Sequence, residues 1–161
     1  MARRLFFSFH YERDVSRANV VRNSWVTQDR EAAGFFDAGL WEEAKRKGDA
    51  AIRRMIDEAL VGSSVTAVLI GAETADRDYV SYEITQSYGS KGLLGIYIHN
   101  IKNLAGQTDS PGPNPFDRLT VELNGQRRYL SSLYRTYNWV VDNGYANLGT
   151  WVEAAARAAG R

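Results

Sequence analysis

The chain has 161 residues, of which 44% are hydrophobic and 24% charged, which suits a folded globular domain and argues against a mainly disordered chain. Twenty Lys and Arg stand against nineteen Asp and Glu, so the net charge of +1 provides no field that would draw the protein onto nucleic acid or an anionic membrane. The absence of Cys excludes a disulfide framework, a thiolate metal site and a Cys nucleophile, and it favours a reducing compartment.

The apolar run near the N-terminus does not have the length of an export signal. It ends at His10, too early for the core of a signal peptide, and no stretch of the sequence approaches the roughly 20 apolar residues that span a bilayer. We therefore expect one cytoplasmic domain over residues 1–161, with no membrane segment and no nucleic-acid partner.

The first elements in chain order are a strand and a short helix. Residues 5–9 form an apolar, aromatic run without helical spacing, which predicts a buried strand. Asp14 is a candidate N-cap for a short helix that follows. The sequence from residue 26 to residue 39 has no clear period and predicts a loop that holds Phe35 and Phe36 against the core.

The middle of the chain alternates helical and strand patterns. Asp49 is expected to cap an amphipathic helix, and two continuous apolar runs, residues 65–70 and 92–98, predict strands buried on both faces. A second helix is expected between these strands, over residues 78–88. This alternation at short spacing predicts an α/β fold with a parallel sheet. The apolar positions of the first helix are Ile52, Met55, Ile56, Ala59 and Leu60.

The last third of the chain begins with a proline-rich loop near residues 110–116, which we expect to lie within the single domain. The dipeptide Asn124-Gly125 predicts a hairpin turn, and residues 134–141 predict an aromatic edge strand. Asn147 is a candidate cap for a final helix. The side chains expected to pack inward from that helix are Leu148, Trp151, Val152 and Ala155.

Several common catalytic motifs are absent from the sequence. It has no Walker phosphate loop, no glycine-rich dinucleotide fingerprint, no His-Glu-x-x-His and no Gly-x-Ser-x-Gly elbow. The two histidines, His10 and His99, each follow a predicted strand, at the sheet edge where open α/β folds bind ligands. No further residues suggest a ligand set around them, so we expect no metal site.

Glu83 is the candidate catalytic residue that helical spacing singles out. Val80, Ile84 and Ser87 mark the buried stripe of the second helix, and Glu83 falls on its border, one turn after Tyr79. A half-buried carboxylate at a sheet edge is a candidate for catalysis. Spacing alone favours the alternative, a surface glutamate that makes a contact with a residue four positions away.

Aromatic side chains near the predicted strand ends also allow two interpretations. They could stack on a nicotinamide or adenine ring, or they could pack against one another in the core. Trp139 and Trp151 are expected in the core. The basic run Lys45-Arg-Lys47 could meet a pyrophosphate, but a solvated helix face is the favoured interpretation. The aromatic residues in question are Phe9, Tyr11, Trp41, Tyr79 and Tyr82.

The sequence Leu5-Phe-Phe-Ser-Phe-His-Tyr-Glu-Arg-Asp14 resembles the first strand and following loop of TIR domains. Residues 65–70 resemble the second core strand of that family, and Tyr79-Val-Ser-Tyr-Glu83 resembles its aromatic-Cys-x-x-Glu motif. Val80 stands where many TIR domains have Cys. Four later segments are similar to the TIR-like proteins of bacterial Thoeris antiphage defence, and these are residues 71–83, 95–100, 112–116 and 143–151.

This resemblance implies a flavodoxin-like, three-layer fold with a central, mostly parallel sheet. It also implies NAD⁺ as substrate, no separate cofactor, and cleavage of the nicotinamide–ribose bond followed by cyclisation to a cyclic ADP-ribose isomer. Glu83 takes the place of the catalytic glutamate. The residues that the resemblance suggests for substrate binding are Ser8, Phe9, His10, Tyr79 and Tyr82.

The family resemblance further implies a signalling role in which the cyclic product activates a separate effector protein. A phage-derived activator and self-association are expected on the same basis. One alternative is a TIR-like adaptor that assembles with similar domains and performs no chemistry. A receiver-like module is a third interpretation, but Ser8 and Gly71 stand where acidic residues would be required.

Overall fold

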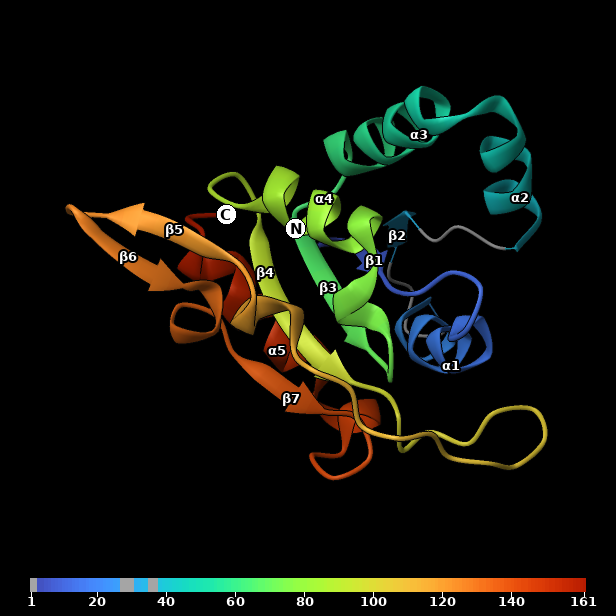
Figure 1. The fold of residues 1–161 in the computed structure, drawn as a ribbon. Helices are drawn as coiled ribbons and strands as arrows, with labels where there is room; N and C mark the ends of the chain where they lie inside the picture. Colours follow the sequence, from blue (N-terminus) through green and yellow to red (C-terminus); the bar gives the residue numbers. More distant parts are fainter. Residues whose placement is uncertain (1–2, 27–30, 35–37) are drawn as a thin grey trace.

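A computed structural model describes residues 3–26, 31–34 and 38–161. Its centre is a parallel sheet of five strands in the order β2-β1-β3-β4-β7 (Figure 1). This order corresponds to the 2-1-3-4-5 arrangement of flavodoxin-like folds, so the expected fold class is confirmed. The strands are β1 (Arg4–Ser8), β2 (Glu31–Gly34), β3 (Val65–Ile70), β4 (Gly92–Tyr97) and β7 (Thr136–Asn138).

Helices cover both faces of the sheet and make it the middle layer of three. On one face α1 contacts α5, and α5 packs on β3 and β4; on the other, α4 packs on β1, β3 and β4 and contacts α3 (Figure 1). Helix α2 packs on α3. The helices are α1 (Val15–Val26), α2 (Ala38–Lys47), α3 (Asp49–Val61), α4 (Asp78–Ser87) and α5 (Gly144–Ala158).

The predicted central elements are confirmed by burial. Every residue of β3 is buried, as expected for a strand covered by helices on both faces. Of the apolar positions expected in α3, Ile52, Ile56 and Leu60 are buried, while Met55 and Ala59 are partly buried against the same core. Trp139 and Trp151 belong to that core, as expected.

Residues 26–39 differ from the predicted loop. Residues 31–34 form the edge strand β2, which pairs in parallel with β1 through Arg4 and Glu31 and through Leu5 and Ala32, and α2 begins at residue 38. The backbone of β1 supplies the hydrogen-bonding partner for this strand, which its own side-chain pattern did not indicate. Phe35 and Phe36 lie outside the described residues.

Two of the three predicted helix caps are wrong. Asp14 stands directly before α1, in the predicted N-cap position, but its carboxylate makes no hydrogen bond to the helix and lies 3.6 Å from Arg17. Gly48 stands at the N-cap of α3, so Asp49 is the first helical residue and its carboxylate accepts from Arg53. Asn147 lies inside α5, which begins after Asn143.

The second half of the chain adds a hairpin beside the sheet. Strands β5 (Thr120–Leu123) and β6 (Gln126–Tyr129) are antiparallel, and the turn residues have positive φ angles of 52° at Asn124 and 78° at Gly125, which confirms the predicted hairpin. The predicted aromatic edge strand is present but shorter, because only residues 136–138 pair with β4. Three short 3₁₀ helices, Thr74–Asp76, Pro115–Asp117 and Leu130–Ser132, complete the described elements.

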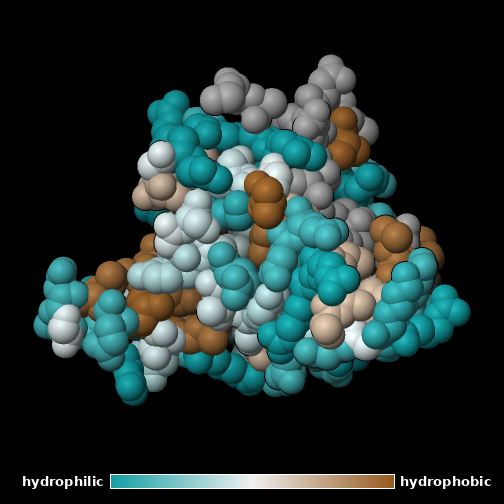
Figure 2. Space-filling view, turned by 90° about the horizontal axis from the view of Figure 1, so that it is seen from above, coloured by the Kyte–Doolittle hydropathy of each residue, from teal (hydrophilic) through white to brown (hydrophobic). Residues whose placement is uncertain are grey.

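The surface seen in Figure 2 is mostly hydrophilic, and its hydrophobic residues gather in separate areas. Within residues 3–26, 31–34 and 38–161, no helix combines the length and the apolar character needed to cross a membrane.

Candidate active site around Glu83

The Glu83 side chain lies between α4 and the C-terminal end of β1. Its Oε1 accepts a hydrogen bond of 2.7 Å from the hydroxyl of Ser8, the last residue of β1, and its Oε2 accepts one from the hydroxyl of Tyr11 in the following loop. Both donors are buried, and Glu83 itself has 0% of its surface exposed. The carboxylate is therefore enclosed by groups of the same chain.

The buried face of α4 is wider than its apolar stripe and includes Glu83. Val80 and Ile84 pack into the core, and the Ser87 hydroxyl, one turn after Glu83, donates to the Glu83 carbonyl and lies 2.7 Å from the Thr66 hydroxyl on β3. The sequence predicted a half-buried carboxylate at the border of this face. Full burial corrects that prediction, and it arises because the loop after β1 covers the carboxylate.

The environment of Glu83 favours its neutral form. Burial raises the pKa of Glu83 to about 8, although the hydrogen bonds from Tyr11 and Ser8 act in the opposite direction. No residue in the described part of the chain forms an ion pair with Glu83. A cationic group that reached Glu83 would therefore find no positively charged side chain of the described residues already paired with it.

A cluster of aromatic rings connects Tyr11, which contacts the carboxylate of Glu83, to α2. The ring of Tyr11 lies 4.6 Å from that of Phe9 and 4.4 Å from that of Trp41, and the Trp41 ring lies 5.5 Å from that of Tyr79, all measured between centroids. Phe9, Tyr11 and Trp41 are buried in the core. In this arrangement these rings pack on one another, which is the second of the two interpretations that the sequence allowed.

The predicted substrate-binding residues of β1 and its loop are far from Glu83 in the chain, and the fold places them in different surroundings. Ser8 contacts the carboxylate directly, whereas Phe9 is enclosed in the core. His10 is 7% exposed, its Nδ1 accepts from the backbone N–H of Arg13, and its Nε2 lies 3.9 Å from Glu73. Burial lowers the pKa of His10, which favours the neutral ring.

Tyr79 and Tyr82, the other predicted substrate-binding residues, connect α4 to α3. The Tyr79 hydroxyl donates to Asp49, and the Tyr82 hydroxyl donates to Asp57 at 2.7 Å. The guanidinium of Arg53 lies 4.6 Å above the Tyr82 ring. Both hydroxyls are thus bonded to α3 rather than to Glu83.

A second buried carboxylate, Asp14, was not singled out by the sequence beyond its position before a helix. Neither of its oxygens has a hydrogen-bond partner among the described residues, and the Arg17 Nη1 lies 3.6 Å away. Burial raises the pKa of Asp14 to about 6, and Arg17 opposes that shift. A Cβ on Gly71 would lie 2.2 Å from Asp14 Oδ2, so only glycine fits where β3 ends.

Arg17 also ties α1 to the loop after β4. Its Nε donates to the carbonyl of Ile101 at 2.7 Å and its Nη2 to the carbonyl of Gln107 at 2.9 Å. Within the described ranges, no three His, Asp or Glu side chains gather as a metal site would require. Asp14 and Arg17 therefore form a structural ion pair, whereas Glu83 has no cationic partner among the described residues.

Comparison with known proteins gives two findings. The family described as Thoeris protein ThsB, TIR-like domain, matches residues 6–103, more than half of the chain. A Bacillus cereus (strain MSX-D12) protein named "Putative cyclic ADP-D-ribose synthase ThsB1" is 41% identical over 192 aligned residues, covering 94% of this chain and 100% of that protein. The chain therefore belongs to the family of Thoeris ThsB proteins with a TIR-like domain.

Proposed function

We propose that this protein consumes NAD⁺ by breaking the bond between nicotinamide and ribose and cyclises the remainder to a cyclic ADP-ribose isomer. The name of the Bacillus cereus relative supports this activity. The structural observation that carries the proposal is Glu83, a fully buried carboxylate at the end of β1 with hydroxyl donors and no cation among the described residues.

The chemistry requires a group that stabilises positive charge. When the nicotinamide–ribose bond breaks, its electron pair leaves with nicotinamide and the ribose carbon becomes cationic, as in glycoside cleavage. A hydroxyl or ring nitrogen of the same molecule then attacks that carbon, and one proton is released in the overall reaction. An ionised Glu83 in a water-poor site would stabilise the cation or hold the ribose hydroxyls.

Water exclusion decides between cyclisation and hydrolysis. The internal nucleophile competes with water only when it is held close to the cationic carbon and water is kept away. Tyr11, which contacts Glu83, and the rings of Phe9 and Trp41 packed on it provide such an environment. In this proposal Ser8 orients the carboxylate, and binding of the nucleotide by His10, Tyr79 and Tyr82 stays a prediction.

The partners follow from the same activity. NAD⁺ serves as substrate without a separate cofactor, and the cyclic product would act on a separate effector protein in antiphage defence. A phage-derived activator and self-association are further parts of this proposal, and both bear on how the enclosed carboxylate becomes accessible.

The direct test is nicotinamide release from NAD⁺, followed by chromatography, with the nucleotide product identified by mass. The assay uses lysates of phage-infected cells that express the wild type, Glu83→Gln or Glu58→Gln; Glu58 is exposed on α3. We expect Glu83→Gln to lose at least about 100-fold of the activity and Glu58→Gln to retain it. Full turnover by Glu83→Gln would overturn the proposal. Absence of turnover by the wild type would favour the adaptor alternative.

A further inference from the structure

The carboxylate of Glu83 has no free face for a substrate in this structure. Glu83 is 0% exposed and Tyr11, which covers it, is 4% exposed. Both carboxylate oxygens are engaged by O–H donors of the chain, one from Ser8 and one from Tyr11. A ribose presents donors of the same kind, two neighbouring hydroxyls, so the Tyr11 hydroxyl stands where a substrate hydroxyl would bind.

Tyr11 is held in this position by α2. The Trp41 ring, 2% exposed, packs on Tyr11, and it also contacts the Tyr79 ring on α4. Two polar contacts join α2 to the same loop, from Lys45 Nζ at 3.2 Å and from Trp41 Nε1 at 3.4 Å, and both end on Glu12 Oε1. Trp41 thus links α2 to the Tyr11 ring that covers Glu83.

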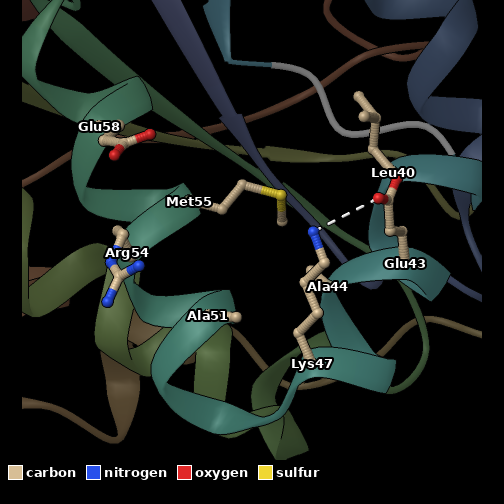
Figure 3. A pocket seen from close by; sticks show the side chains of 8 residues that line it. All are labelled: Leu40, Glu43, Ala44, Lys47, Ala51, Arg54, Met55 and Glu58. Carbon is tan, nitrogen blue, oxygen red and sulfur yellow. Dashed lines mark ion pairs between the residues drawn. The ribbon is translucent and has the colours of Figure 1, made fainter.

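On its other side α2 packs against α3. A cavity of about 300 Å³ lies between the two helices, and Figure 3 shows that its lining side chains come from both. Leu40, at this cavity, is 48% exposed. The ion pair drawn there, between Lys47 and Glu43, lies within α2 and does not connect the helices.

We propose that α2 is a lid which, through Trp41, holds the Tyr11 hydroxyl on Glu83 as an internal substitute for a substrate hydroxyl. This rests on the proposed function of Glu83. The structure is then the closed, resting form, and NAD⁺ enters after α2 and Tyr11 move away. Exchange of one O–H donor for another on the carboxylate is nearly balanced, so the displaced aromatic contacts set most of the cost of opening.

Lid opening can be measured without any enzymatic activity. Because the chain has no Cys, Glu83→Cys introduces a single thiol whose rate of alkylation by iodoacetamide reports exposure at this position. Ser87→Cys is the matched control, since Ser87 is equally buried one turn further along α4. We expect Trp41→Ala to accelerate alkylation at position 83 by about tenfold and at position 87 by less than about twofold.

Two outcomes would overturn the lid. Equal acceleration at both positions would show a general loosening of the fold, and no acceleration at position 83 would show that α2 does not control access. If Trp41→Ala does not fold, Glu12→Gln serves instead, because it weakens the contacts of α2 to the loop without touching the core; we then expect a smaller acceleration at position 83 alone.

The role of the Tyr11 hydroxyl has its own test. Tyr11→Phe keeps the ring and removes the hydroxyl, so the KM for NAD⁺ should fall by about tenfold while kcat is retained. Tyr129→Phe, on the exposed strand β6, should leave both unchanged. A loss of kcat in Tyr11→Phe would contradict the proposal that the Tyr11 hydroxyl takes the place of a substrate hydroxyl. If neither wild type nor variants turn over NAD⁺, the proposed function fails, whereas the alkylation result still decides on the lid.

Discussion

Two buried carboxylates near the C-terminal end of β1, Glu83 and Asp14, have opposite surroundings. Glu83 accepts hydrogen bonds from two hydroxyls and has no cationic partner among the described residues. Asp14 accepts no hydrogen bond from that part of the chain but lies 3.6 Å from Arg17. Burial raises the pKa of both, to about 8 for Glu83 and to about 6 for Asp14.

The contrast indicates which carboxylate is available for chemistry. Arg17 already supplies a positive charge to Asp14 and anchors the loop after β4 through Ile101 and Gln107, so this pair maintains structure. The donors to Glu83 are neutral hydroxyls, and a cationic ribose would bring a positive charge to it. A buried acid without a counter-charge costs stability, and functional sites are where such strongly shifted groups gather, which supports the assignment of Glu83.

The largest effect should come from breaking the Asp14 pair. Arg17→Met removes the cation and two hydrogen bonds to backbone carbonyls, and it leaves Asp14 buried without that partner. We expect the free energy of unfolding in urea to fall by about 4 kcal/mol. The double variant Asp14→Asn with Arg17→Met should recover part of this loss. A loss under about 1 kcal/mol in the single variant would show that the pair is not structural.

In contrast to Arg17→Met, the variant Glu83→Gln is expected to be more stable than the wild type at high pH. Its pKa is about 8 in the fold against an ordinary value of 4.5, so between these values the unfolded chain has lost a proton that the folded chain still holds. The stability of the wild type therefore falls as pH rises from 4.5 to 8, and Glu83→Gln does not share that fall. The variant should become more stable than the wild type by about 3 kcal/mol at pH 8, relative to about pH 5.5.

Urea unfolding across this pH range measures the difference, and Glu58→Gln controls for the loss of an acidic group. A difference between wild type and Glu83→Gln that stays constant from pH 4.5 to pH 8 would show that Glu83 is not a neutral buried acid.

A smaller effect is expected from the Ser8 hydroxyl. Ser8→Ala removes one donor from the Glu83 carboxylate and leaves Oε1 without that partner, so the free energy of unfolding should fall by about 1 kcal/mol. Because this hydrogen bond lowers the pKa of Glu83, the pH dependence described above should extend to higher pH in the variant. An unchanged pH dependence would show that the Ser8 hydroxyl does not influence the pKa of Glu83.

Local patterns sufficed to predict the elements that position Glu83. The continuous apolar run of β3 and the helical spacing of Val80 and Ile84 indicate these elements from neighbouring residues alone. The Asn124-Gly125 turn was predictable for the same reason, since its positive φ angles are a property of the dipeptide. The family resemblance then gave Glu83 a role that spacing alone left open.

Features that depend on distant residues were not predictable. Tyr11 binds Glu83 across 72 positions of the chain, and its ring is fixed by Trp41 of another helix, so neither periodicity nor motif spacing could indicate full burial. Strand β2 exists through its pairing with β1.

The start of α5 is a further case in which packing decides what the local pattern does not. Asn147 has the capping preference, yet the helix already begins at Gly144. Gly144 lies against the Trp139 ring, where an added Cβ would not fit, and this close approach depends on the folded turn before the helix. The sequence pattern therefore placed this helix start four residues too late.

The central claim is that Glu83 is the carboxylate that makes the protein an NAD⁺-consuming enzyme. The most direct measurement is mass spectrometry, with chromatographic separation, of small molecules from phage-infected cells expressing the wild type or Glu83→Gln at equal protein levels. A product with the mass of cyclic ADP-ribose should be present with the wild type and absent with Glu83→Gln. Equal amounts of that product in both would contradict the account.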